Sequence, residues 1–198
     1  MNIIIDINNI IVRSIKSYCL LLVITYLFIL FLISIPAYAQ VSEYEVKAIF
    51  LQKFTAFIDY PKESGIDEKS KPFTIGVIGE NPFGNILEDY YSIIEIKDKK
   101  VKILYISDTS EISSCNILFI SKSEKKHLSE ILSFTRHKPI LTVSDSKGFA
   151  ERGVLINFYL DYEKVRFEIN YKAVKESGIY MNFRLLNIAR IVETEGKN

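Results

Sequence analysis

The chain has 198 residues, with 25 lysines and arginines against 24 aspartates and glutamates, and a formal net charge of +1. This balance, without a stripe of basic residues interleaved with aromatics, argues against nucleic-acid binding. A chain of this length is the size of one domain and buries a core large enough to need no disulfide staples.

The N-terminal segment is typical of a secretory signal peptide. Two basic residues precede an uncharged run over residues 19–35, and Ala37-Tyr38-Ala39 follows as a small-x-small cleavage pattern. We predict cleavage after Ala39, which leaves residues 40–198 as an α/β domain in the periplasm. The uncharged run also reaches the lower limit for a membrane span, so a retained anchor is the alternative.

The first part of the exported domain alternates helical and strand patterns. Residues 43–58 repeat apolar side chains at three- and four-residue spacing, which predicts an amphipathic helix ended by Tyr60-Pro61. A strand is expected at residues 73–78. Asn81 should then cap a helix that has Pro82 in its first position and runs to about residue 91.

The same alternation continues to the end of the chain. Branched residues predict further strands at 101–106, 116–120 and 139–143, with a helix from residue 123 or 124 to residue 135 between the last two. Two helices, at 171–176 and 182–192, are expected to close the chain on either side of Gly178.

Residues 156–160 and 165–169 predict a β-hairpin. Apolar and polar residues alternate in both runs, and residues 161–164 form the turn. One face is then apolar and the other polar and charged, in a register that a slip of one residue would destroy. The expected cross-strand pairs are Leu160 with Val165, Tyr159 with Arg166, Phe158 with Phe167, Asn157 with Glu168 and Ile156 with Ile169.

Strands that alternate with helices indicate an α/β fold with a mainly parallel sheet. The terminal hairpin adds at least one antiparallel strand, so the sheet should be mixed. We predict a single-domain three-layer sandwich, with about five to six strands, a C-terminal antiparallel hairpin and flanking helices.

No arrangement of residues predicts catalysis or a bound metal. His127 and His137 have no carboxylate or cysteine at metal-ligand spacing, and no nucleophile elbow accompanies them. Cys115 is the only thiol left after signal cleavage, so no internal disulfide can form. We interpret Cys115 as a buried small hydrophobe; a redox-sensing or intermolecular thiol is the alternative.

Residues 76–84 combine a strand, a glycine turn and a helix start, where α/β folds bind anions or nucleotides. Their spacing fits neither the dinucleotide fingerprint nor the P-loop, so we expect no cofactor. In the structural interpretation Gly79 makes the turn and Asn81 caps the helix. A small-molecule crevice at the strand ends is the alternative.

Charged residues gather around the predicted hairpin. One interpretation is a partly buried ion-pair network that seats a helix on the sheet, because arginine binds carboxylates bidentately. The other is a docking or ligand-binding patch. Nearer the N-terminus, Phe57 and Tyr60 form either a corner of the core or an exposed anchor. The candidate partner or ligand contacts are therefore Phe57, Tyr60, Asn81, Glu151, Arg152, Arg166 and Glu168.

Nine segments in the same order resemble the YfiR family of exported regulatory proteins, over residues 43–192. They are Glu45-x-Lys47-Ala48-x-Phe50-Leu51, Phe54…Phe57…Pro61, Gly76-Val-Ile-Gly-x-Asn-Pro-Phe-Gly84, Cys115-Asn116-Ile-Leu-Phe-Ile-Ser121, Leu141-Thr-Val, Gly148-Phe-Ala-Glu-Arg-Gly153, Ile156-Asn-Phe158, Val165-Arg-Phe-Glu-Ile-Asn170 and Arg184-Leu-Leu-x-x-Ala189.

The resemblance implies a non-enzymatic periplasmic repressor. It would bind the sensor region of an inner-membrane diguanylate cyclase, hold it inactive and so lower cyclic-di-GMP and biofilm formation. An outer-membrane lipoprotein would sequester the repressor under envelope stress. A homodimer would match the symmetry of a dimeric cyclase. The alternative function is a periplasmic small-ligand-binding sensor module that serves a histidine kinase or another receptor.

Overall fold

The computed structural model describes residues 18, 20–26 and 42–194, and the chain divides into two units, Met1–Gln40 and Val41–Asn198. In the first unit, residues 18 and 20–26 are helical. Among the helices of the described ranges, none has the length and apolar character needed to cross a bilayer. The predicted cleavage point after Ala39 lies outside the described residues.

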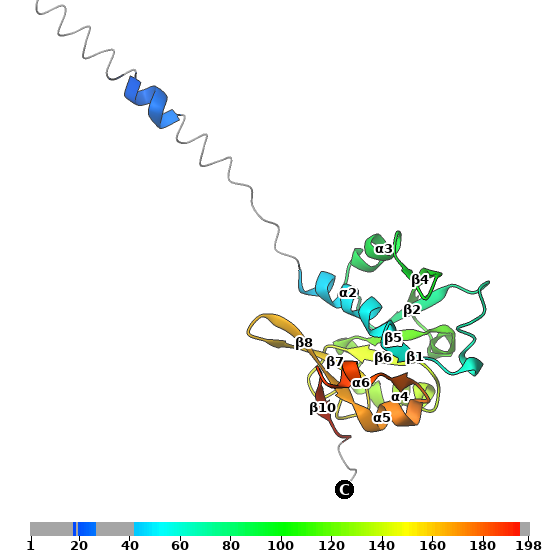
Figure 1. Cartoon of the computed structure of the whole chain (residues 1–198). Helices are drawn as coiled ribbons and strands as arrows, with labels where there is room; N and C mark the ends of the chain where they lie inside the picture. Colours follow the sequence, from blue (N-terminus) through cyan, green and yellow to red (C-terminus); the bar gives the residue numbers. More distant parts are fainter. Residues whose placement is uncertain (1–17, 19, 27–41, 195–198) are drawn as a thin grey trace, which may run out of the picture. The chain divides into compact units, whose positions relative to one another are not determined.

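The second unit is built on an eight-stranded mixed sheet with the order β10-β8-β7-β6-β5-β2-β4-β3 (Figure 1). Neighbouring strands run parallel except in the β3–β4 and β7–β8 pairs. The α/β class and the mainly parallel sheet are confirmed, but β3 and β10 were not predicted. The strands are β2 (Phe73–Ile78), β3 (Glu95–Ile96), β4 (Lys99–Ile106), β5 (Ile117–Ile120), β6 (Leu141–Ser144), β7 (Ile156–Asp161), β8 (Lys164–Asn170) and β10 (Arg190–Val192).

Helices and a small second sheet complete the unit. β1 (Ile58–Asp59) and β9 (Tyr180–Met181) pair antiparallel. The α-helices are α2 (Glu43–Thr55), α3 (Ile86–Tyr91), α4 (Leu128–Thr135), α5 (Tyr171–Ser177) and α6 (Phe183–Leu186), and the 3-10 helices are η1 (Lys62–Ser64), η2 (Thr109–Ser114) and η3 (Lys122–Lys126).

Each face of the large sheet packs against its own hydrophobic cluster. Along β5, Ile117 and Phe119 face one cluster and Leu118 and Ile120 face the other, as the period of a strand requires. Side chains of α2, α3, α5 and α6 join the first cluster. Those of α4 and η2 join the second. The sheet therefore lies between two helical layers, as predicted.

The predicted hairpin register is confirmed in every pair, from Ile156 with Ile169 to Leu160 with Val165. The turn residues Tyr162 and Glu163 both have positive φ, 45° and 63°, as a two-residue type I′ hairpin turn requires. β6 pairs with β7 only through the first two residues of β7. The rest of the hairpin extends beyond the body of the sheet (Figure 1).

The hairpin has the expected apolar and polar faces, but burial does not follow these faces at either end. At the tip, the apolar Leu160 is 54% exposed because the hairpin leaves the sheet there. At the base, Asn157 and Glu168 are 1% and 2% exposed. These two polar side chains are therefore buried where the hairpin joins the sheet.

The helix predicted from residue 123 or 124 starts as the 3-10 helix η3 and is α-helical only from Leu128. Two other predicted helices differ more. α3 begins at Ile86 because Gly84 has a φ of +56°, outside the helical region, and Asn81 closes the preceding turn instead of capping the helix. The Asn81 side chain accepts from the Phe83 amide and donates to the Gly84 carbonyl, both at 2.9 Å.

The second difference is at the C-terminus. The helix predicted over residues 182–192 ends at Leu186, and the chain returns as β10, parallel to β8. Ile191 and Val192 suit a strand, and pairing covers part of the edge that β8 would otherwise expose. This return places Arg190 beside Glu168 in register.

Candidate functional site

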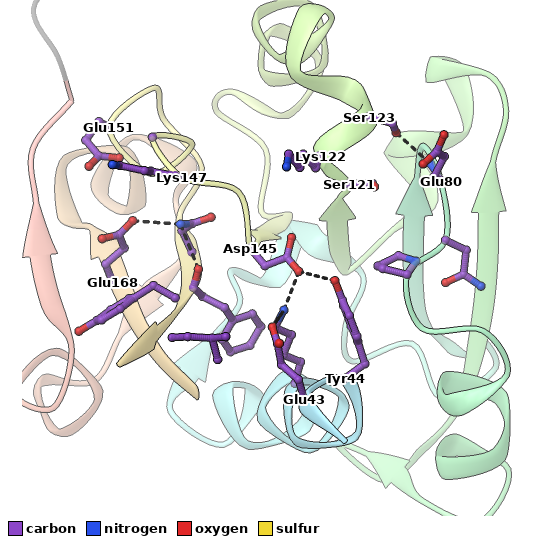
Figure 2. A pocket seen from close by; sticks show the side chains of 18 of the residues that line it. Glu43, Tyr44, Glu80, Ser121, Lys122, Ser123, Asp145, Lys147, Glu151 and Glu168 are labelled. Atoms are coloured by element: carbon purple, nitrogen blue, oxygen red, sulfur yellow. Dashed lines mark hydrogen bonds and ion pairs between the residues drawn. The ribbon is translucent and has the colours of Figure 1, made fainter. Parts of the chain in front are cut away.

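A cavity of about 1010 Å³ opens at the carboxyl ends of β2, β5 and β6 (Figure 2). The chain runs from β2 to β4 on one side and then crosses to β5 on the other, so the sheet has its topological switch point here. Open α/β sheets bind ligands at such points. The lining comprises residues 43, 44 and 47 of α2, residues 80–82 after β2, residues 121–123 after β5, residues 145, 147 and 148 after β6, residue 151, hairpin residues 157–160 and 168, and residue 190.

Gly79 allows the loop after β2 to approach the loop after β5. Its φ is +90°, which side chains other than glycine rarely adopt, and a Cβ atom there would collide with the Ser123 hydroxyl. The Glu80 amide donates to the same hydroxyl at 3.0 Å. The predicted role of Gly79 in a tight turn therefore agrees with the structure.

The first polar group in the cavity, here called the Lys47 cluster, comprises Glu43, Tyr44, Lys47 and Asp145. Lys47 is 2% exposed, and its Nζ lies 2.5 Å from Glu43 Oε1 and 2.6 Å from Asp145 Oδ2. The Tyr44 hydroxyl donates to Asp145 Oδ2 at 2.9 Å. Burial, and then the Asp145 charge, raise the pKa of Tyr44, so its hydroxyl stays a donor. The cluster ties α2 to the end of β6.

The second group, here called the Glu168 cluster, comprises Glu151, Asn157, Glu168 and Arg190. Arg190 donates to Glu168 Oε2 through Nε at 2.9 Å and also through Nη2. Asn157 Nδ2 donates to Glu168 Oε1 at 3.0 Å. The hydrogen bond to Glu168 raises the pKa of Arg190. The guanidinium also lies 4.2 Å from the centre of the Tyr159 ring.

Two acceptors of the Glu168 cluster have no donor. Glu151 Oε2 and Asn157 Oδ1 are buried without a hydrogen-bond partner. The Asn157 amide is held in this orientation because Nδ2 has two acceptors, Glu168 Oε1 and the Phe158 carbonyl at 3.3 Å. A flipped amide would set its oxygen against both of them. Among the described residues, no ion pair includes Glu151.

The fold and these clusters can be set beside known proteins. The family described as YfiR/HmsC-like matches residues 44–190. The chain belongs to the YfiR/HmsC-like family. This is a family of periplasmic regulatory proteins that are not catalytic.

The chain was also compared with curated protein sequences and with solved structures. No curated protein sequence matches the chain. A solved ABC domain from Streptococcus pneumonia, in complex with L-Trp, is similar with a TM-score of 0.47 and 14% sequence identity, over 71% of this chain and 61% of that chain.

In this YfiR/HmsC-like chain, the charged residues singled out from the sequence separate. Glu151 and Glu168 lie together in the cavity, and Glu168 pairs with Arg190. Arg152 is exposed and donates to the Lys125 carbonyl at 3.2 Å. Arg166 lies on the hairpin, 3.9 Å from Asp161. The predicted ion-pair network among Glu151, Arg152, Arg166 and Glu168 is therefore wrong, because β10 supplies the arginine that Glu168 binds.

The remaining candidates lie apart from the Glu168 cluster. Asn81 lines the cavity near Glu80. Phe57 and Tyr60 are partly buried against the core, and the Tyr60 hydroxyl donates to the Asn116 carbonyl at 3.3 Å. Cys115 is 4% exposed, and burial raises the pKa of its thiol to about 11.

Six residues of the two clusters were not among the candidates from the sequence. Two of them carried a signal. Lys47 interrupts the buried stripe of α2, which calls for a buried partner, and Asp145 follows a predicted strand at its carboxyl end, where sites form. Arg190 carried none, because its segment was assigned to a helix. The missed residues are Glu43, Tyr44, Lys47, Asp145, Asn157 and Arg190.

Proposed function

We propose that the protein is an exported, non-enzymatic regulator that binds the periplasmic sensor region of an inner-membrane diguanylate cyclase and represses it. The observation that carries the proposal is the family match over residues 44–190, which covers nearly all of the described α/β unit. Export follows from the predicted signal peptide. Repression would lower cyclic-di-GMP and, with it, biofilm formation.

Such a repressor works by differential affinity. It binds the inactive conformer of the cyclase more tightly than the active one, and the difference sets the shift in population. A coupling free energy of about 1–3 kcal/mol changes the output roughly 5- to 150-fold. An outer-membrane lipoprotein that competes for the repressor would reverse the effect. A homodimer of the repressor would present two equivalent surfaces to a dimeric cyclase.

The proposal is tested in cells and with purified components. Deletion of the gene should raise cyclic-di-GMP, and expression of the full chain should restore the lower level. The exported domain should also bind the cyclase sensor region in a titration and reduce cyclase activity in membranes. An unchanged cyclic-di-GMP level in every growth condition would contradict the proposal.

The exposed arginines give a test of the docking surface. Arg152 and Arg166 are exposed, so their replacement by alanine should leave stability within about 0.5 kcal/mol. If these arginines contact the cyclase, both variants weaken the titrated binding. Lys102→Ala, also at an exposed position but on β4 at the other side of the sheet, serves as the matched control.

The cavity favours a second candidate, a small-ligand-binding sensor module that serves a histidine kinase or another receptor. Its supporting observation is the position of the cavity at the topological switch point of the sheet. A ligand that binds only the folded state raises the melting temperature. Thermal-shift screening of the exported domain against nucleotides, amino acids and envelope metabolites is the test. A screen without a stabilising compound would contradict this candidate.

A further inference from the structure

The unpartnered oxygens of the Glu168 cluster indicate what kind of group the cavity receives. Glu151 and Asn157 both line the cavity, and each has one buried acceptor without a hydrogen-bond partner, Oε2 and Oδ1 respectively. A buried acceptor without a donor is costly, and in folded proteins such atoms normally have a protein, water or ligand partner. Both atoms are acceptors, so their partners are N–H or O–H donors. An ammonium group brings three donors and no acceptor.

The charge of the lining points in the same direction. Five carboxylates and four basic side chains line the cavity, which gives 4 − 5 = −1. Glu43 and Asp145 are paired with Lys47, and Glu168 with Arg190. Glu151 is the carboxylate that remains in the Glu168 cluster. The Glu151 carboxylate would attract a cation and repel an anion.

The neighbouring wall is apolar. Phe158, Tyr159 and Leu160 of the hairpin line the cavity; Phe158 is buried, and Tyr159 and Leu160 present the accessible surface. An alkyl or aryl body can lie against these side chains while its charged end reaches the carboxylate. The volume of about 1010 Å³ lies at the upper end of the range for small-molecule sites, roughly 300–1,000 Å³.

Lys147 is a donor from the chain itself that must be considered. Figure 2 shows it beside Glu151 at the same end of the cavity, with Glu168 below. Nevertheless, Lys147 is exposed and forms no ion pair with Glu151. The terminal carboxylate torsion of Glu151 is soft, so Oε2 can turn toward a donor in the cavity at little cost.

We infer that the Glu168 cluster binds the primary ammonium group of a small organic cation, with Glu151 and Asn157 as acceptors and the hairpin wall against the body of the ligand. The inference rests on the second candidate function, in which the cavity takes a small ligand. It adds the chemical class of that ligand.

A matched four-carbon series tests the inference by calorimetric titration of the exported domain. Putrescine and butylamine carry ammonium groups, 1,4-butanediol is neutral and succinate is a dianion, while the carbon skeleton keeps its length. The two amines should bind, and the diol and succinate should bind at least about tenfold more weakly, because a charge-assisted hydrogen bond is lost. Equal binding of the diol, or no binding of either amine, would overturn the inference.

Three variants locate the site. Glu151→Gln keeps the shape but removes the charge, and should weaken butylamine binding at least about tenfold. Glu80→Gln makes the same change at the other end of the cavity and should leave binding within about twofold, as expected for a solvent-screened charge. Lys147→Met removes a competing ammonium and should bind butylamine at least as tightly. Equal losses in the two glutamine variants would overturn the assignment to Glu151.

The series also separates this inference from the sensor function on which it rests. If succinate or another anion binds and the amines do not, the cavity is a ligand site of a different class, and only the ammonium inference fails. If no compound of the series or of the wider screen binds, both fail. Circular dichroism of each variant establishes that a loss of binding does not come from unfolding.

Discussion

The two polar clusters of the cavity both contain buried charges, but they differ in how many of their polar groups have a partner. In the Lys47 cluster, one buried cation has two carboxylates, and the tyrosine hydroxyl completes the set. In the Glu168 cluster, one buried carboxylate has its donors, but two nearby acceptors have none. A fully paired cluster holds the fold together, whereas an incompletely paired one leaves a place for another molecule. The Lys47 cluster is thus the structural end of the cavity, and the Glu168 cluster is the end with acceptors for another molecule.

The largest effect is expected from Asp145→Ala in the Lys47 cluster. The change removes one of the two carboxylates of buried Lys47 and the acceptor of Tyr44. Breaking a buried pair from one side costs about 3 kcal/mol in the free energy of unfolding. Urea unfolding measures it. The matched control is Asp161→Ala, which breaks an exposed pair with Arg166 at 3.9 Å and should cost less than about 0.5 kcal/mol. Equal costs would mean that Lys47 is solvated, and the contrast between the clusters would disappear.

A smaller loss, about 2 kcal/mol, is expected from Arg190→Gln in the Glu168 cluster. Glu168 would keep the Asn157 amide but lose both guanidinium bonds. The half-exposed Arg190 lies on an edge strand, so water can replace part of what is lost. Urea unfolding with an unchanged m-value would check this expectation. A cost below about 0.5 kcal/mol would show that Glu168 does not depend on β10.

Tyr44→Phe should cost about 1 kcal/mol, the contribution of one hydrogen bond. It also changes the response to alkaline pH. The pKa of Tyr44 is raised in the folded state, so the folded protein binds this proton more tightly than the unfolded chain. The stabilisation is present below about pH 10 and is lost as the pH rises further. The free energy of unfolding, measured by urea denaturation between pH 9 and pH 11, should therefore fall less steeply with pH in the variant than in the parent protein. An identical slope would contradict the expectation.

The smallest effect on stability is expected from Glu151→Gln, within about 0.5 kcal/mol of the parent. Its carboxylate has no ion-pair partner among the described residues, so a neutral amide of the same shape loses nothing. Thermal unfolding without added ligand is the measurement. A loss comparable to that of Arg190→Gln would mean that Glu151 belongs to the structural end of the cavity.

Local patterns in the sequence predicted the hairpin and its register because the alternation of side chains and the two-residue turn lie within 14 residues. They also predicted the α/β class and the six main strands. β10 could not be found in this way, because three residues pair with a strand about 20 positions earlier. Their assignment to a strand comes from the open edge of β8, which is a tertiary feature.

The same limit explains the wrong ion-pair network. Arginine and glutamate side chains near the hairpin were correctly recognised as candidates for pairing, but composition does not say which pair meets. Glu168 binds Arg190 because β10 runs beside β8, and Arg152 instead points to the carbonyl of Lys125. Lys47 and Asp145 were visible in the sequence as charged residues at unusual positions. Arg190 depended on where the last strand lies.

The Lys47 cluster joins parts of the chain that are 98 and 101 residues apart. Closing loops of that size costs entropy before any contact is formed, so such contacts form late in folding. A partly folded chain would then have a sheet but no finished cavity. Ligand or partner binding at this edge would select molecules whose folding is complete, and a newly made chain would become active only after α2 has docked.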